Sequence, residues 1–447
     1  MKNRFVVFGA AFVYFCACAE EKKTTETLSF EEAVVAAYNS NKGWKANQTE
    51  KKSAEEDLFR AKMMFLPSVN GRISSTRSRV EGVSTQDTIF GTNTQRGTSK
   101  STDTRFGVSV SQNLFSGLTT INRIRASDNS LKATNAKLKF EEQKLIVNVL
   151  DAYTSVWVGR QKIVALKKKE ENLRKTMDSK NTSLEAGAGT PSEVAEAKAN
   201  YSKAVYERIQ AETELFTAEA NFEKLTGLKP TEKNIELPDL SLQLPENLDK
   251  LVARAMAANC SILSGKFAER AEFDKLRVAK GALVPSCNLA LNADRSLQKQ
   301  KYNNSNSNFS ATLTVDVPLF SNDPSQGNAY SAVEIANQHA LKAKFTAEDT
   351  VLEVKKECVD NWNKYISAGA MIKACRSAVK SGEVSTESNL EENAMGTKSN
   401  TEILVKENQL LDARIDLANS RRQRIVSLMT IMALSGDLSL QTLFKKK

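Results

Sequence analysis

The sequence has few of the residues that break helices or bind metals. Its 447 residues include eight prolines and a single histidine, His339. His339 has no cysteine, histidine or carboxylate at a convincing ligand spacing, and no acid, base and nucleophile form a recognisable set elsewhere. We therefore predict no catalytic residue, no metal site and no cofactor. Gly187 and Gly189 indicate a turn and not a phosphate-binding loop, because no strand precedes them.

Long apolar runs are also lacking. After residue 20 the sequence has no run of the eighteen or more apolar residues that a membrane-spanning helix needs. A shorter run from Phe5 to Phe15 follows two basic residues and leads to small residues around Cys18, which predicts a secretory signal peptide over 1–19. The same residues are equally consistent with a lipoprotein in which Cys18 is acylated, and both interpretations stay open.

Neither the charge nor the cysteines indicate a specialised site. The net charge of +10 becomes +8 when the two basic residues of the signal peptide are removed, and no cluster of arginines and aromatic residues accompanies it. We therefore predict no nucleic-acid partner. Cys358 and Cys375 lie seventeen residues apart in one predicted helix, which is roughly 25 Å at the helical rise. Such a distance excludes a disulfide between them.

The two halves of the sequence resemble one another. LSFEEAVVAAYNSN from Leu28 aligns with ENLDKLVARAMAAN from Glu246 at an offset of 218 residues, and Pro67 aligns with Pro285 at the same offset. Further on the offset falls to 209, because the stretch after the proline is shorter in the second half. Repeats of this length predict an internal duplication. The predicted parts are a first repeat over 20–230, a linker over 231–245, a second repeat over 246–437 and a basic tail over 438–447.

Prolines stand only at the edges of periodic segments, which leaves two long stretches uninterrupted. The first runs from about 118 to 186, and both stretches carry apolar residues seven apart, which is typical of a coiled-coil seam. A helix of nearly 70 residues would be roughly 100 Å long. Each long helix is predicted to reverse into an alanine-rich helix, giving helical hairpins over 118–228 and 325–436. The residues seven apart are Leu131, Leu138, Leu145 and Ala152, and Val351, Cys358, Tyr365, Ile372 and Val379.

Between the leading helix and the hairpin, each repeat shows alternation of period two. Phe106 and Val108 alternate with Gly107 and Ser109, for example. One apolar face and one hydroxyl-rich face over about ten residues are typical of a strand that crosses an outer membrane. The predicted strands are 67–80, 104–115, 285–296 and 307–319, and the polar segments 81–103 and 297–306 are predicted to be exterior loops.

Four strands are too few to close a barrel in lipid. Transmembrane barrels have at least eight strands, and an open sheet edge in lipid leaves backbone groups unsatisfied. We therefore predict that several chains share one barrel, and that three chains would supply twelve strands. The predicted fold class is an α+β membrane protein, with long helical hairpins forming an α-barrel and four transmembrane strands per chain in a shared 12-stranded trimeric β-barrel.

The order of these motifs resembles that of TolC-type outer-membrane efflux proteins. The motifs are LSFEEAVVAAYNSN, LPS at a strand start, SQNLFSG and DVPLFS at strand ends, and FEKLTG at the end of the return helix. The resemblance implies an outer-membrane channel subunit of a tripartite efflux or type I secretion system, a passive duct without catalysis. It implies a homotrimer set in outer-membrane lipid, whose periplasmic helices meet an adaptor protein and an inner-membrane transporter. The alternative is a periplasmic coiled-coil adaptor, which predicts one helical hairpin flanked by compact β modules.

The resemblance also implies a gate at the tip of the second hairpin. The run from Gly396 to Glu402 looks like the family's GTRTIVD tip, with Lys398 at the arginine position and Glu402 at the first aspartate. Glu193 is the counterpart of Glu402 in the first repeat. The alternative is that Lys398 and Glu402 are only a solvated pair at a helix start.

Two departures from the family pattern weaken the expected gate. Asn393 stands where the family has a tyrosine, and Val405 replaces a second aspartate. A lysine also offers a point charge in place of the bidentate fork of an arginine. The predicted gate residues are therefore Lys398, Glu402 and Glu193. The tip residues expected to contact the adaptor are Gly187, Gly189, Thr190, Gly396 and Thr397.

Overall fold

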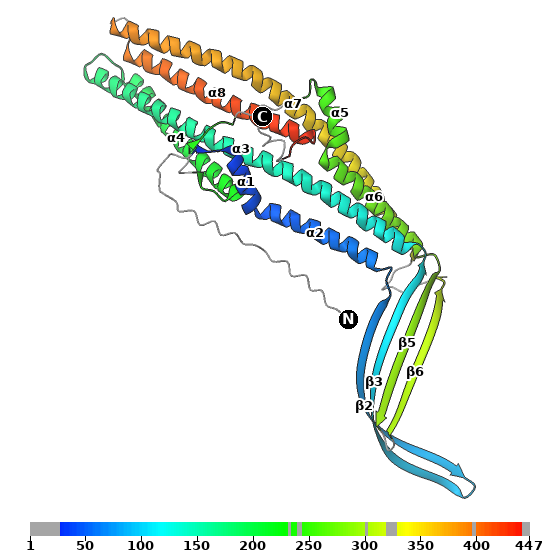
Figure 1. Cartoon of the computed structure of the whole chain (residues 1–447). Coiled ribbons are helices and arrows are strands. Elements are labelled where there is room, and N and C mark those ends of the chain that lie inside the picture. Colours follow the sequence, from blue (N-terminus) through cyan, green and yellow to red (C-terminus); the bar gives the residue numbers. More distant parts are fainter. Residues whose placement is uncertain are drawn as a thin grey trace, which may run out of the picture.

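The computed structural model describes residues 27–230, 234–238, 244–299, 303–318, 329–395 and 399–439. The predicted signal peptide, with Cys18, lies outside these ranges. A bundle of long helices continues at one end into a curved sheet (Figure 1). Within the described ranges, no helix is both long and apolar enough to cross a membrane.

The two repeats contain the same series of elements. The first has β1 (Thr27–Leu28), α1 (Phe30–Ser40), α2 (Lys42–Met63), β2 (Ser68–Thr88), β3 (Gly91–Ser116), α3 (Thr119–Glu185) and α4 (Pro191–Thr226). The second has β4 (Asn234–Ile235), α5 (Leu248–Ala258), α6 (Cys260–Gly281), β5 (Ser286–Lys299), β6 (Asn303–Asp316), α7 (Ala329–Ala394) and α8 (Asn400–Leu434). The predicted duplication and the two helical hairpins, α3–α4 and α7–α8, are confirmed. A single hairpin between compact β modules, as the adaptor alternative requires, is not what the chain forms.

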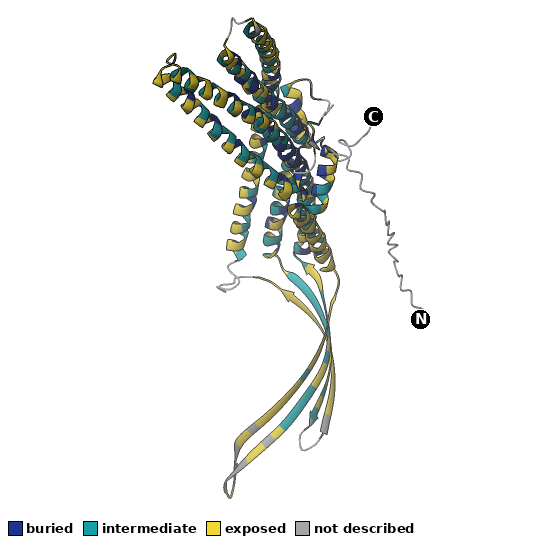
Figure 2. Cartoon of the chain, turned by 90° about the vertical axis from the view of Figure 1, so that its left-hand side faces the viewer, coloured by how far each residue is buried: buried dark blue, intermediate teal, exposed yellow. Residues whose placement is uncertain are grey.

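The long helices bury the seams that the sequence predicts. α3 has 67 residues and α7 has 66, and both run without a kink-forming proline. Leu145 and Ala152 of α3 and Cys358 and Ile372 of α7 are buried. Figure 2 shows that the buried residues concentrate in the helical part of the molecule, while β2, β3, β5 and β6 are exposed or half-buried.

The main core lies where α1 meets the middle of α3. Tyr153 is fully buried there beside Phe222, and its hydroxyl donates a hydrogen bond to the carbonyl of Leu28 at 2.7 Å. Leu28 belongs to β1, which pairs in parallel with β4. The predicted linker 231–245 therefore contains a strand. Leu438, in the predicted tail, is also buried in this core.

The sheet is antiparallel with the strand order β2-β3-β5-β6. All four predicted strands are confirmed, but the predicted loop over 81–103 is wrong. β2 and β3 stay paired up to Thr88 and Gly91, so that most of this segment is a protruding two-stranded ribbon. Likewise β5 reaches Lys299 and β6 begins at Asn303, which leaves little of the predicted loop 297–306. Serine and threonine pair well across strands, as Ser78 and Ser101 do at 2.7 Å.

The register gives the sheet two unlike faces. Side chains of paired residues point to the same face, and neighbours along a strand point to opposite faces. One face carries apolar residues such as Val69, Ile73, Val108, Phe309 and Leu313. Ile73 is 75% exposed and Phe309 is 73% exposed, so no other part of the described chain covers this face. The opposite face carries polar residues, listed by strand as Asn70, Arg72, Ser109, Asn292, Asp294 and Ser310.

Candidate gate at the helical tips

The first tip is a tight turn between α3 and α4. Gly187 has a φ of +73°, a backbone conformation that favours glycine. The N–H groups of Gly187 and Ala188 donate to the carbonyls of Leu184 and Ser183 at 3.0 and 2.9 Å, which closes the end of α3. A Cβ at Gly189 would lie 3.0 Å from the backbone nitrogen of Leu184. The predicted turn role of both glycines thus follows from the local backbone.

Thr190 and Glu193 form a capping box at the start of α4. The Thr190 hydroxyl accepts a hydrogen bond from the Glu193 N–H at 3.3 Å, and the Glu193 carboxylate accepts one from the Thr190 N–H at 3.4 Å. Pro191 is the first residue of α4, where a proline is well tolerated because its missing N–H would have no partner within the helix. Glu193 also forms an ion pair with Lys180 of α3 at 3.7 Å. The Glu193 carboxylate therefore fastens the two helices of its own hairpin together at the tip.

The second tip has the equivalent cap. Ser399 caps α8, and Glu402 completes the capping box through a 3.4 Å hydrogen bond from the Ser399 N–H. Gly396, Thr397 and Lys398 lie outside the described residues, so the predicted contact of Lys398 stays a prediction. Figure 1 shows the two hairpin tips at the same end of the molecule, opposite the sheet.

A charged contact links the two hairpins away from the tips. The ammonium of Lys169 on α3 lies 3.0 Å from Asp412 of α8 and 3.4 Å from Glu207 of α4. Burial alone would lower the pKa of Lys169, but hydrogen bonds and charges from Asp412 and Glu207 raise the pKa above the ordinary lysine value. Sequence reasoning missed this contact, because it depends on which helices become neighbours.

A buried amide lies one turn further toward the tips. Asn172 of α3 is fully buried, and its Nδ2 donates to Glu407 and to the Oδ1 of Asn408, at 2.9 and 3.2 Å. Its own Oδ1 has no hydrogen-bond partner within the described part of the chain. A buried asparagine in a coiled-coil seam fixes the register of its helices at a cost in stability. The sequence could have indicated this buried amide, because Asn172 lies within a long helix that has a heptad pattern.

Ion pairs fasten the first hairpin more extensively than the second. Arg208 of α4 contacts Glu170 of α3 at 2.5 Å, and Lys162 of α3 contacts Glu214 of α4 at 2.7 Å. Within the described residues, the α7–α8 counterpart of these contacts is the pair formed by Arg414 with Glu383, at 2.9 Å. The second hairpin is held instead by helix packing and by Arg424 of α8, which lies over the ring of Tyr365 of α7 and donates to its hydroxyl at 3.3 Å.

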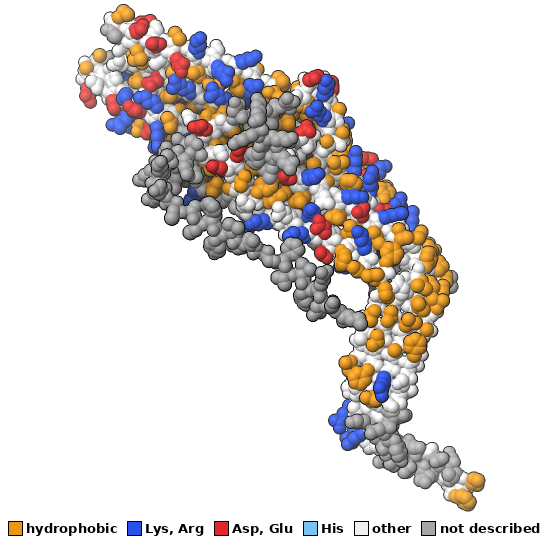
Figure 3. All heavy atoms as spheres, viewed as in Figure 1, with side chains coloured by type: hydrophobic (Ala, Val, Ile, Leu, Met, Phe, Trp, Pro, Cys, Tyr) orange, Lys and Arg blue, Asp and Glu red, His pale blue; other side chains and the backbone are white. Residues whose placement is uncertain are grey.

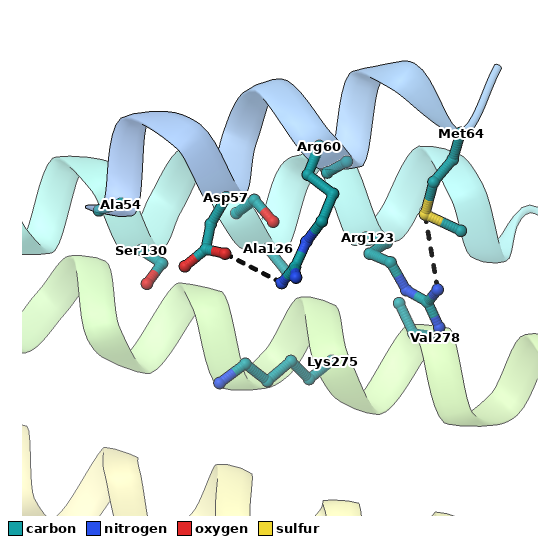
Figure 4. A pocket seen from close by; sticks show the side chains of 11 residues that line it. Ala54, Asp57, Arg60, Met64, Arg123, Ala126, Ser130, Lys275 and Val278 are labelled. Carbon is teal, nitrogen blue, oxygen red and sulfur yellow. Dashed lines mark hydrogen bonds and ion pairs between the residues drawn. The ribbon is translucent and has the colours of Figure 1, made fainter. Parts of the chain in front are cut away.

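A cavity of about 770 Å³ lies at the other end of the helices, between α2, α3 and α6 (Figure 4). Arg60 in this cavity pairs with Asp57 at 2.9 Å, and Lys275 pairs with Glu272 at 2.6 Å. Arg123 donates to the sulfur of Met64 at 3.5 Å. The cavity lies far from the hairpin tips, and two of the three cations that line it already have partners within the chain. We therefore assign this cavity no part in the gate.

Comparisons with known proteins agree with this architecture. A family model described as "Outer membrane efflux protein" matches residues 35–228 and 251–437. The chain is 22% identical to the outer membrane efflux protein BepC of Brucella suis, over 93% of this chain and 86% of the relative. It is 21% identical to the outer membrane protein TolC of Vibrio cholerae, over 75% of this chain and 77% of the relative. The solved Campylobacter jejuni CmeC outer membrane channel shares the fold, with a TM-score of 0.72, 16% identity, and coverage of 94% of this chain and 90% of that chain.

Proposed function

The chain belongs to the outer membrane efflux protein family, and on that premise we propose that three copies of it enclose one continuous exit duct. The family consists of outer-membrane channels that serve efflux and secretion, and not of enzymes. The chain is accordingly an outer-membrane channel protein with a helical periplasmic domain. The proposal concerns the assembly, the gate and the partners, and it includes that the duct is passive and performs no catalysis.

The trimer is supported by the two free edges of the sheet. β2 and β6 are the outer strands of the β2-β3-β5-β6 sheet, so each has one edge without a partner strand in the described chain. Adjacent strands alternate in direction, so β6 of one copy can pair with β2 of the next in the same antiparallel manner. Three copies would give twelve strands and leave no edge open to lipid.

The two faces of the sheet fit this arrangement. The uncovered apolar face, with Ile73 and Phe309, would contact lipid. The polar face, with Asn70 and Asn292, would line the water-filled lumen. In α3, 67 residues correspond to roughly 100 Å. A helical tube of that length would carry the duct across the periplasm toward an adaptor protein and an inner-membrane transporter.

We place the gate at the hairpin tips. Lys398, if it reaches Glu402 or the Glu193 of a neighbouring hairpin, would hold the periplasmic entrance closed through charge. The equivalent positions of Glu193 and Glu402, each in the first turn of a return helix, support this assignment. The tip residues Gly187, Gly189, Thr190, Gly396 and Thr397 are proposed to contact the adaptor.

Two neighbouring residues of β6 provide the test of this proposal. Leu313 lies on the apolar face and Thr312 on the polar face. A lysine at position 313 would face lipid, where it costs about 2–4 kcal/mol at the bilayer midplane. Leu313→Lys should therefore reduce insertion into vesicles, whereas Thr312→Lys should insert normally and change the ion selectivity of the pore in planar bilayers. Equal effects of the two substitutions on insertion, or a wild-type monomer by light scattering in detergent, would contradict the shared barrel.

A further inference from the structure

The apolar face of the sheet ends in a group of positive charges. Arg77 and Arg79 follow Ile73 along β2 at even spacing, so they point to the same face as Ile73. Lys100 of β3 is the register partner of Arg79 and shares that face. We name Arg77, Arg79 and Lys100 the rim cluster. Figure 3 shows Lys and Arg side chains near the lower end of the sheet, below its hydrophobic surface.

Like charges face each other directly within the rim cluster. Arg79 and Lys100 stand opposite one another in the ladder, and Arg77 is the diagonal neighbour of Lys100. Like charges directly opposite one another destabilise a sheet. Glu81 neutralises Arg79 at 2.5 Å, but Arg77 and Lys100 form no ion pair with any described residue. The cluster therefore carries two uncompensated positive charges on an exposed surface.

On the opposite face of the same strands, the positive and negative charges balance. Arg105 pairs with Asp103 at 2.8 Å on the polar face. Arg72 and Asp294 occupy one row of that face, separated by Gly107. The lumenal charges thus alternate in sign within the chain. The excess of positive charge belongs to the face that would contact lipid.

The position of the cluster matches the headgroup level of a bilayer. Arg77 lies four residues beyond Ile73, which is roughly 13 Å along a strand. Thr102, the partner of Arg77, makes the last pair between β3 and β5, so the cluster also marks where the four-stranded sheet narrows to the ribbon. Charges cost little on the lipid face near the interface, in contrast to the midplane.

We propose that the rim cluster binds the phosphate groups of lipids in the outer leaflet of the outer membrane. Guanidinium groups bind phosphate in a bidentate manner, and an ammonium adds a point charge. A phosphate between Arg77, Arg79 and Lys100 would relieve the repulsion within the ladder. It would also fix the depth of each protomer in the membrane. This inference rests on the proposed function, because it requires that the apolar face contact lipid.

The test is lipid binding to the purified trimer, measured by native mass spectrometry. The probes are bisphosphorylated lipid A and the same lipid after removal of its phosphates. We expect the wild-type trimer to retain the bisphosphorylated lipid and to bind the dephosphorylated lipid far more weakly. In the Arg77→Ser, Arg79→Ser, Lys100→Ser variant the affinity should fall by about fivefold for each cation removed. The matched control is Arg72→Ser, which removes a cation from the lumenal face of the same strand and should bind as wild type does.

Further variants and controls distinguish lipid phosphate binding from its alternatives. Arg77→Lys with Arg79→Lys keeps the charges and should retain most of the binding even where the serine variant folds poorly. Equal retention by the serine variant and the wild type would overturn the inference, as would equal binding of both lipids. Full competition by millimolar inorganic phosphate would also overturn it, because the site would then bind a free anion. Light scattering and vesicle insertion of the wild type, measured first, show separately whether the proposed function holds.

Discussion

Asn259 donates a hydrogen bond from its Nδ2 to the carbonyl oxygen of Leu434 at 3.1 Å, which joins the start of α6 to the end of α8. The first repeat makes the corresponding bond from Asn41 to Leu225 at 3.3 Å. Each asparagine also caps its helix through its Oδ1. The duplication has therefore kept one side chain that closes the end of one helix and starts another.

Replacing these two asparagines provides a matched comparison. Asn259 is buried, whereas Asn41 is only partly buried. Asn259→Ala would leave the Leu434 carbonyl and two capping N–H groups without their partner, at a cost of about 1–3 kcal/mol. We expect Asn259→Ala to lower the thermal unfolding temperature of the protein more than Asn41→Ala does. An equal or larger effect of Asn41→Ala would show that burial does not set the difference.

The link from Lys169 to Asp412 should restrain the movement of α8 relative to α3. Asp412→Asn removes the charge that pairs with Lys169, so the entrance should open more often, measured as open probability in planar bilayers. Asp416→Asn is the control, because it makes the same change one turn along α8 at an exposed carboxylate with no ion pair among the described residues. Identical open probabilities for the two variants would show that this link does not restrain the gate.

The same link has a predictable pH dependence. The raised pKa of Lys169 means that the folded protein holds this proton more tightly than the unfolded chain does. Its stabilising contribution is fully present below the ordinary lysine pKa of about 10.4 and is lost only as the pH rises through the higher folded value. The difference in the free energy of unfolding between Asp412→Asn and the wild type should therefore be constant from neutral pH to about pH 10. A difference that disappears near pH 8 would assign the effect to another group.

Local chemistry made the tips and caps predictable. Gly187 and Thr190 stand where a turn and a helix start require them, and the structure places them there. Proline at the segment edges and the heptad pattern gave the bounds of α3 to within one residue. These features depend on residues a few positions apart, so a single sequence contains the information.

Features that depend on distant residues were missed. The segment over 81–103 carries little apolar alternation in its sequence. The two halves of this segment are strands because they pair with each other. The sequence pattern does not show that pairing, so it favoured a loop. The contacts of Asn172 and Asp412 likewise depend on α3 meeting α8. Helix neighbours are set by tertiary packing and not by periodicity.

The amino terminus distinguishes a free chain from a lipoprotein. If Cys18 is acylated, Cys18→Ala should alter processing and abolish metabolic labelling with palmitate. If segment 1–19 is a cleaved signal peptide, mass spectrometry of the wild type should find an unmodified chain beginning at Glu20. That result would exclude the lipoprotein interpretation.

The charge of Lys398 should hold the periplasmic entrance closed. A contact with Glu193 or Glu402 inside a narrow entrance would be partly shielded from water, so it should exceed the ~0–1 kcal/mol of an exposed ion pair. Lys398→Glu would place like charges around a threefold ring, spread the tips and raise single-channel conductance in planar bilayers. Lys398→Arg should keep the entrance closed or close it more tightly, because a guanidinium can bind a carboxylate in a bidentate manner.

Conductance measured at different salt concentrations distinguishes an electrostatic gate from one closed by side-chain packing. Ions screen charges over about 10 Å at 0.1 M and about 3 Å at 1 M, so high salt should reproduce part of the opening in the wild type, after correction for bulk conductivity. The effect should be smaller in Lys398→Glu, where the attraction is already lost. Glu193 and Glu402 are engaged in their capping boxes without help from Lys398, so the helices should survive the substitution and circular dichroism should be unchanged. If the conductance of Lys398→Glu equals that of the wild type at every salt concentration, side-chain packing and not charge closes the entrance.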